Sequence, residues 1–168
     1  VTHWSNATGN IQAAAFAGTR RPGIDEFALV RDELTAEIIP DEGGRHVHPV
    51  MAQLLYRSKG PDRILVITDA GYRKPGDQDR AGADVSIDRE GNLCGSRLSM
   101  NRSARNFQNF TGCSLPELFR MTSLNAARLL GLDPSVGSIA AGKLANLVVL
   151  NDDWSVARTF LRGRAVFP

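Results

Sequence analysis

Short apolar runs alternate with one amphipathic segment in the first half of the chain. The run Asp62–Asp69 is rich in β-branched residues between polar ends, which is typical of a strand buried in a parallel sheet. Phe27–Val30 and Leu34–Pro40 predict two further strands. Pro49–Ser58 carries apolar positions at helical spacing, with its proline in the first helical turn. A strand, a helix and a strand in this order predict a parallel sheet and an α/β fold.

A hairpin and three helices are predicted in the middle of the chain. Asp84–Ile87 and Asn92–Cys94 flank a polar turn, which predicts a small β-hairpin. The three helical segments are Met100–Phe110, Leu115–Thr122 and Asn125–Leu130. Ser114 and Glu117 match a capping box before the second of these helices, and Gly131 stands where the third is expected to stop.

The pattern changes to short strands near the carboxyl terminus. Ala145–Leu150 predicts one strand, and Arg158–Phe167 predicts two that turn around Gly163. We therefore divide the chain into an α/β part, residues 1–135, and a β unit, residues 136–168.

Composition narrows the classes of protein to which the chain can belong. Its 168 residues, 42% hydrophobic and 23% charged, are typical of a globular protein with a core of moderate size. The 20 Lys and Arg residues are scattered and nearly balanced by 18 Asp and Glu, so no nucleic-acid partner is predicted. No stretch has the length and apolarity of a membrane span. Cys94 and Cys113 lack metal-ligand spacing and favour a reducing, cytoplasmic setting, although the sequence leaves a disulfide between them open.

Three side chains able to do metal or proton chemistry follow strand-like segments. Asp69 closes the central apolar run, His46 follows the run Leu34–Pro40, and His3 stands at the start of the chain. Catalytic groups and ligands gather at the carboxyl ends of parallel strands. The sequence therefore predicts an active-site rim at these three residues. Because only two residues precede His3, we expect Val1–His3 to be the tail of a strand and the sequence to be a carboxyl-terminal portion.

Gly137–Lys143 superficially matches a phosphate-binding loop. Such a loop needs Ser or Thr after its lysine and lies between a strand and a following helix. Leu144 follows the lysine here, and the flanking elements are reversed. We therefore interpret this segment as a glycine turn that enters a strand.

Several motifs occur in a fixed order along the chain. They are Thr2-His3, Asn6-Ala7, Arg20-Arg21-Pro22-Gly23, His46-Val47-His48-Pro49, Val66-Ile67-Thr68-Asp69-Ala70, Gly95-Ser96-Arg97-Leu98-Ser99-Met100 and Gly137–Lys143. In this order they resemble the motifs of N-acetylglucosamine-6-phosphate deacetylases, which belong to the metal-dependent amidohydrolase superfamily. The resemblance covers essentially the whole chain, and it is therefore more specific than any single motif.

The resemblance implies a fold and a reaction. The fold is a (β/α)8 barrel with a small β-sandwich built from both chain ends. Residues 1–135 would supply the last strands and helices of the barrel, and residues 136–168 strands of the sandwich. The implied reaction is metal-dependent hydrolysis of N-acetylglucosamine 6-phosphate, a small amino-sugar phosphate, to glucosamine 6-phosphate and acetate. The implied full-length protein is cytoplasmic and forms a homo-oligomer.

The resemblance also implies roles for single residues. His3 matches a ligand of a divalent metal, zinc by expectation, whose further ligands lie outside this chain. Asp69 matches the catalytic acid/base. The residues that match substrate contacts are His46, Asn6, Ala7 and Arg20. The arginine would bind phosphate, in some members across a dimer interface.

These residue types suit amide hydrolysis. A divalent metal polarises a carbonyl and lowers the pKa of water to roughly 7. Asp69 is able to take the proton of that water and return it to the departing amine, and His46 to donate to the developing oxyanion. An arginine fork fits the phosphate.

Simpler structural roles compete with each assignment. His3 and Arg20 could be solvated surface residues, Asp69 could cap a turn, and His48 is better explained as a capping or solvated histidine. The turn before His46 is longer than the Asp-Gly-x of the family, and such a length is able to displace the histidine. The competing functions are a non-catalytic remnant or interaction module, and an amidohydrolase that acts on another cyclic amide or amidine.

Overall fold

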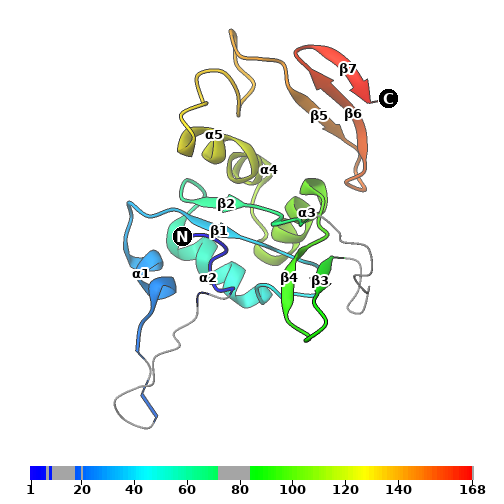
Figure 1. Cartoon of the computed structure of the whole chain (residues 1–168). Coiled ribbons are helices and arrows are strands. Elements are labelled where there is room, and N and C mark those ends of the chain that lie inside the picture. The colour runs from blue at the N-terminus through cyan, green and yellow to red at the C-terminus, as the bar shows by residue number, and fades with distance from the viewer. Residues whose placement is uncertain (7, 9–17, 20, 72–83, 168) are drawn as a thin grey trace.

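A parallel βαβ unit forms the centre of the described structure. The computed structural model describes residues 1–6, 8, 18–19, 21–71 and 84–167 (Figure 1). β1 (Ala36–Ile38) pairs with β2 (Ile64–Val66) in parallel, with Glu37 opposite Leu65. α2 (Pro49–Lys59) connects the two strands. The predicted strand, helix and strand are therefore confirmed, although the strands themselves are shorter than the apolar runs that contain them.

Local sequence signals place α2. Pro49 occupies the first helical position, where a missing N–H is harmless. The His48 ring accepts a hydrogen bond from the Val50 N–H at 3.3 Å, so the predicted capping role of His48 is confirmed. The helix ends at Gly60, whose φ of +64° favours glycine. It buries Ala52 and Leu55 against the sheet.

The strand predicted at Phe27–Val30 is wrong, because these residues belong to α1 (Ile24–Val30). The Gly23 N–H donates to Glu26 Oε2 at 2.8 Å and satisfies one free donor of the first turn. Asp25 and Glu26 also place negative charge at the helix amino terminus. A short apolar run cannot by itself distinguish a helix from a strand.

The predicted hairpin is confirmed. β3 (Val85–Ile87) pairs antiparallel with β4 (Leu93–Ser96), and Val85 lies opposite Ser96. At the turn, Asp88 Oδ1 accepts the backbone N–H groups of Glu90 at 3.0 Å and Asn92 at 2.8 Å. The end of β4 reaches the segment after β2 through a parallel bridge between Ala70 and Ser96.

The helical region agrees with the prediction except in one turn. The helices are α3 (Met100–Thr111), α4 (Leu115–Phe119), the π-helical turn η1 (Arg120–Leu124) and α5 (Asn125–Leu129). The capping box is confirmed, since Glu117 Oε2 accepts from Ser114 N at 3.0 Å and from Ser114 Oγ at 2.5 Å. The helix predicted at Leu115–Thr122 is α-helical only to Phe119. From Arg120 it continues with the wider hydrogen bonding of a π-helix. Gly131, at φ +68°, follows α5.

The predicted carboxyl-terminal strands are confirmed as an antiparallel sheet. They are β5 (Leu147–Leu150), β6 (Val156–Leu161) and β7 (Arg164–Phe167), in the order β5-β6-β7. Gly163, at φ +78°, lies in the tight turn between β6 and β7. Figure 1 shows this sheet at one end of the molecule, away from β1 and β2. Asn101 of α3 joins it to the rest by a 2.7 Å hydrogen bond from its side-chain amide to the Trp154 carbonyl.

One apolar core lies between the central strands and the helices. Its largest fully buried apolar side chains are Trp4, Phe107, Ile38, Ile39, Leu55, Ile64, Leu118 and Met121. Each buried side chain of this size contributes about 1.5–3 kcal/mol relative to exposure. Cys94 is exposed and Cys113 is buried, and both are free thiols, so the disulfide that the sequence left open is not formed. In the described ranges, no helix has the length and apolarity needed to cross a membrane.

Candidate functional site

The predicted site residues follow three neighbouring segments of the chain. Residues 1–4 form no regular strand, but they lie alongside β1, since Glu37 N donates to Val1 O at 2.9 Å and Trp4 N donates to Glu37 O at 2.7 Å. β1 in turn pairs with β2. His3 therefore lies in a turn segment alongside β1, whereas His46 and Asp69 come after β1 and β2, which pair in parallel. Asn6 connects the two histidines, because its backbone carbonyl contacts the His3 ring and its side chain contacts the His46 carbonyl.

The His3 ring is oriented by the backbone. Its Nδ1 lies 2.7 Å from the carbonyl oxygen of Asn6. A carbonyl can only accept, so Nδ1 carries a proton, and in the neutral ring Nε2 is the atom with the lone pair. This arrangement suits a metal ligand, whose second ring nitrogen is usually held by a carbonyl or carboxylate. The residues that the structure describes hold no cluster of three or more potential ligands, and they therefore fit a metal only as one part of its ligand set.

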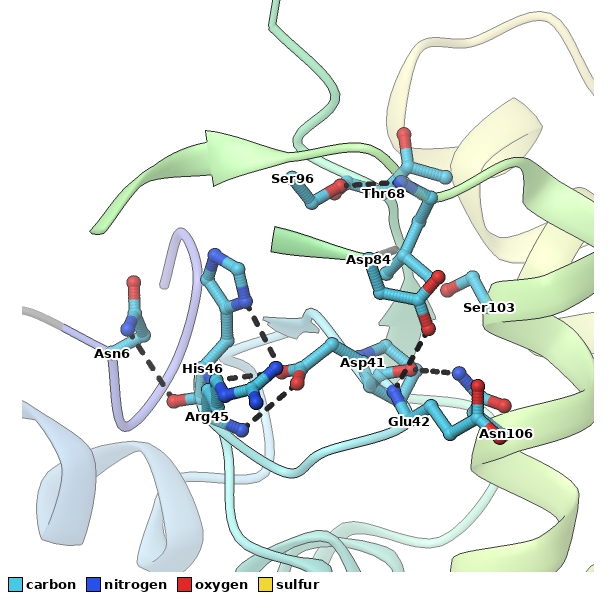
Figure 2. Close-up of polar contacts among 12 residues, drawn as sticks. Asn6, Asp41, Glu42, Arg45, His46, Thr68, Asp84, Ser96, Ser103 and Asn106 are labelled. Carbon is cyan, nitrogen blue, oxygen red and sulfur yellow. Dashed lines mark hydrogen bonds and ion pairs between the residues drawn. The ribbon is translucent and has the colours of Figure 1, made fainter. Parts of the chain in front are cut away.

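His46 is buried against the carboxylate of Asp41. The His46 side chain is 1% exposed and that of Asp41 is fully buried. Asp41 Oδ1 lies 3.1 Å from His46 Nδ1 and accepts the His46 backbone N–H at 2.7 Å. Asp41 Oδ2 accepts the Arg45 N–H at 2.9 Å. Figure 2 shows the ring and the carboxylate side by side, with Asn6 on the other side of His46.

These contacts keep Asp41 ionised. Burial acts to raise the pKa of Asp41, but the hydrogen bonds from the His46 ring and from the N–H groups of Arg45 and His46 outweigh it and hold the pKa below its usual value. The opposite ring atom, His46 Nε2, is buried and has no hydrogen-bond partner among the described residues. Buried polar atoms are nearly always paired, so Nε2 is a candidate contact for a ligand.

The loop that carries His46 is held at its amino-terminal end by two contacts. Asn106 of α3 donates from its side-chain amide to the Pro40 carbonyl at 3.0 Å. Asp84 accepts the Glu42 N–H at 3.2 Å (Figure 2). It also pairs with Arg102 at 2.5 Å. These partners come from α3 and from the start of the hairpin, and they hold the first residues of the turn in place.

Asp69 is placed through its backbone. Its φ is +48°, a left-handed conformation that is costly for a residue with a side chain. Ser103 Oγ donates to the Ile67 carbonyl at 2.8 Å, and the Ser96 hydroxyl donates to the Thr68 carbonyl (Figure 2). The Ser96 N–H donates to the Asp69 carbonyl at 2.8 Å. The side chain of Asp69 is left exposed at the end of β2.

The substrate contacts implied by the resemblance are only partly described. Asn6 lies beside His46, with its side-chain nitrogen 3.4 Å from the His46 carbonyl. Ala7 and Arg20 lie outside the described residues. Asp25 of α1 orders the segment around Asn6, since its carboxylate accepts from Ser5 N at 3.2 Å and from Thr8 Oγ1 at 2.6 Å.

Sequence reasoning missed the residues that hold this site together. Asp41, Asp84 and Ser96 were assigned no role, although each contacts a segment that carries a predicted site residue. The one available signal was the position of Asp41, directly after a strand and five residues before His46.

Gly137–Lys143 forms a turn before β5 and is not a phosphate loop. Gly137 and Gly142 have φ values of +88° and +85°. Lys143 Nζ bonds within the turn, to Ser138 Oγ at 2.7 Å and to the Val136 carbonyl at 3.4 Å. A strand follows rather than a helix, which confirms the interpretation from sequence.

Comparisons with known proteins show which proteins this chain resembles. The model of the amidohydrolase family matches residues 63–166. The N-acetylglucosamine-6-phosphate deacetylase of Bacillus subtilis (strain 168) is 37% identical over 157 residues, which cover 88% of this chain and 39% of that protein. A putative N-acetylgalactosamine-6-phosphate deacetylase of Escherichia coli (strain K12) is 33% identical, over 86% of this chain and 90% of that protein.

Solved structures give the same result. The N-acetylglucosamine-6-phosphate deacetylase of Thermotoga maritima matches with a TM-score of 0.83 at 32% identity, over 99% of this chain and 46% of that one. The enzyme of the same name from Pasteurella multocida matches with a TM-score of 0.82 at 29% identity, over 98% of this chain and 43% of that one. The chain thus spans less than half the length of these two structures, and 39% of the Bacillus relative.

Proposed function

This chain belongs to the amidohydrolase family, and we propose that the protein built on it hydrolyses the acetamide of N-acetylglucosamine 6-phosphate. The products would be glucosamine 6-phosphate and acetate. The observation that supports the proposal is that His46 and Asp69 follow the paired parallel strands β1 and β2, and that His3 lies in the segment bonded alongside β1. Parallel α/β proteins carry their catalytic groups at that edge. The names of the similar proteins support the choice of substrate.

Backbone conformation is unusual at two of the proposed site residues. His3 and Asp69 have φ values of +34° and +48°. Such conformations cost on the order of 1–3 kcal/mol each and occur at functional sites, where the surrounding structure enforces them. They are compatible with a catalytic role, and Ser5, Trp154 and Arg162 share them.

The proposed mechanism assigns the proton transfers to Asp69. Its exposed carboxylate would accept a proton from the attacking water and deliver it to the departing amine nitrogen. His46 would contact the acetamide through Nε2. A bound divalent cation, zinc in this proposal, would polarise the acetamide carbonyl and lower the pKa of water. His3 would hold that cation through Nε2, together with ligands outside this chain.

The remaining assignments concern recognition and assembly. Asn6 and Ala7 would contact the sugar phosphate, and Arg20 would bind the phosphate. Residues 1–135 would form the last strands and helices of a (β/α)8 barrel, and residues 136–168 would contribute strands to a small β-sandwich. The full-length protein would be a cytoplasmic homo-oligomer.

A second substrate is favoured by one comparison. The relative that this chain covers to 90% of its length is named for N-acetylgalactosamine 6-phosphate, the epimer at carbon 4. Both sugars carry the same acetamide and phosphate, so the same Asp69 chemistry would serve either. The two proposals differ only in the sugar hydroxyl that is recognised.

The proposal is tested by acetate release from each of the two sugar phosphates, with zinc added to the purified protein. We expect release from the glucosamine derivative and its loss in Asp69→Asn. Asp88→Asn, in the exposed hairpin turn, is the matched control and should retain wild-type rates. Acetate release that Asp69→Asn does not reduce would contradict the role of Asp69. Faster turnover of the galactosamine derivative would select the second substrate.

A further inference from the structure

We propose that Asp41 is a positioning residue that holds the proton of His46 on Nδ1 and turns Nε2 toward the substrate. The proposal rests on the function proposed above and adds a residue to it. Asp41 would touch neither the substrate nor the metal. It would act through His46, whose ring it fixes in one tautomer and one orientation.

The first step is that Asp41 is an acceptor only. Backbone N–H groups can only donate, and two of them, from Arg45 and His46, point at its two oxygens at 2.9 and 2.7 Å. An ionised carboxylate accepts at both oxygens and carries no proton of its own. The hydrogen bonds that keep the pKa of Asp41 low act in the same direction.

The contact with Asp41 fixes the tautomer of His46. Nδ1 lies 3.1 Å from Asp41 Oδ1, and both groups are buried. A ring protonated only at Nε2 would place the Nδ1 lone pair against a lone pair of the carboxylate. The contact is favourable only when Nδ1 carries the proton, as in histidines held by a carboxylate in other sites.

His46 Nε2 is the ring nitrogen that Asp41 leaves free. Nε2 is buried without a hydrogen-bond partner among the described residues. A neutral ring held in this way accepts at Nε2 from a substrate hydroxyl or amide N–H. Only a doubly protonated ring donates there to an oxygen that gains negative charge, and the Asp41 carboxylate then lies opposite the new positive charge. In both states Asp41 holds Nδ1, so that Nε2 is the ring nitrogen that meets the substrate.

Two carboxylates near Asp41 serve as controls, Glu42 in the loop and Asp84 at the start of the hairpin. Asp84 is also buried and also accepts a loop N–H, that of Glu42, but it has no contact with His46. Glu42 itself is exposed and only 3.6 Å from the Arg102 guanidinium. Asp84→Asn thus weakens the anchoring of the loop but leaves the contact between Asp41 and the His46 ring intact. Glu42→Gln removes a nearby negative charge.

The experiment is nitrogen-15 NMR of the histidine rings in the purified protein, with His46→Gln used to assign the His46 signals. We expect a protonated Nδ1 in the wild type, in Glu42→Gln and in Asp84→Asn, and an increased Nε2–H tautomer in Asp41→Asn. A neutral wild-type ring protonated at Nε2 would overturn the proposal without any variant. An unchanged tautomer in folded Asp41→Asn would overturn it as well.

Kinetics separate this inference from the proposed function. If the wild type releases acetate, Asp41→Asn should lower kcat about 10- to 100-fold, the usual range for residues that orient an active-site group, with a smaller change in KM. Glu42→Gln should keep wild-type kinetics. An equal kcat in Asp41→Asn would overturn the positioning role. A wild type with Nδ1 protonated but no acetate release would contradict the proposed substrate and leave the role of Asp41 supported.

Discussion

The loop that carries His46 and the turn that carries Asp69 place their side chains by different means. His46 is buried, and one carboxylate, Asp41, accepts from its ring and from the backbone N–H groups of His46 and the preceding Arg45. Asp69 is exposed, and its position depends on backbone carbonyls bonded to Ser103 and Ser96. In the proposed roles, the buried His46 ring needs a fixed tautomer, whereas Asp69 as a general base needs contact with water.

The difference predicts different sensitivities to mutation. All of the described hydrogen bonds to the His46 ring and its N–H converge on Asp41, so one substitution removes them together. The bonds that hold the Asp69 turn are divided between α3 and β4, so one substitution leaves part of them in place.

Asp41→Ala should have the largest effect. It leaves the N–H groups of Arg45 and His46 and the ring Nδ1 without their acceptor in a buried site. We expect a loss of about 3 kcal/mol in the free energy of unfolding, from the usual cost of unpaired buried donors. Urea denaturation measures it. Glu42→Ala, which removes an exposed neighbour, should change stability by less than about 0.5 kcal/mol. An equal loss of unfolding free energy in the two variants would contradict the special role of Asp41 in the loop.

Gly44→Ala should displace the His46 loop. Gly44 has a φ of +61°, and an added Cβ would lie 2.8 Å from Pro49 Cδ. Gly60 has a similar φ of +64° but open space around it. Gly60→Ala should cost only the conformational strain, about 1 kcal/mol. Gly44→Ala should cost more and lower kcat. If Gly44→Ala and Gly60→Ala unfold at the same urea concentration, the predicted clash at residue 44 is contradicted.

Gly95→Ala tests the Asp69 turn in the same way. Gly95 has a φ of +89°, and its added Cβ would lie 3.0 Å from the Asp69 carbonyl oxygen. Gly91, at φ +92°, has open space and is the matched control. We expect Gly95→Ala to reduce acetate release more than Gly91→Ala, with a smaller loss of stability than Gly44→Ala. Wild-type turnover in Gly95→Ala would show that β4 does not position Asp69.

Acid should produce the smallest of these effects in the His46 loop, and it should act there through Asp41. The pKa of Asp41 is lowered in the folded state, so its contribution is fully present above the unfolded value of about 4 and is lost as the pH falls through the folded value. The stability difference between the wild type and Asp41→Asn should therefore shrink on acidification. Urea denaturation between neutral pH and about pH 3 measures it. A difference that stays constant would mean that Asp41 is not held as an anion.

Much of the fold was predictable because its signals are local. Periodicity gave α2, the hairpin and the carboxyl-terminal strands, and the capping box gave the start of α4. Phe27–Val30 failed because a short apolar run fits both a strand and a helix, and the acidic first turn decided for the helix. The change to π-type hydrogen bonding at Arg120 has no sequence signal that we recognise.

The site was predictable only in part. His3, His46 and Asp69 could be singled out because they follow strand-like segments, and the family resemblance then supplied their roles. Asp41 could not, because its importance depends on how the loop folds back onto its carboxylate. Ser96 is far from Asp69 in sequence and meets it only through the hairpin.

A crystal structure of the Asp69→Asn variant with N-acetylglucosamine 6-phosphate bound would test the joint use of the two regions most directly. We expect residue 69 and His46 Nε2 to contact the same acetamide group, with Asp41 still bonded to Nδ1. An acetamide that lies away from residue 69, or a His46 Nε2 that the substrate does not reach, would contradict the proposed site.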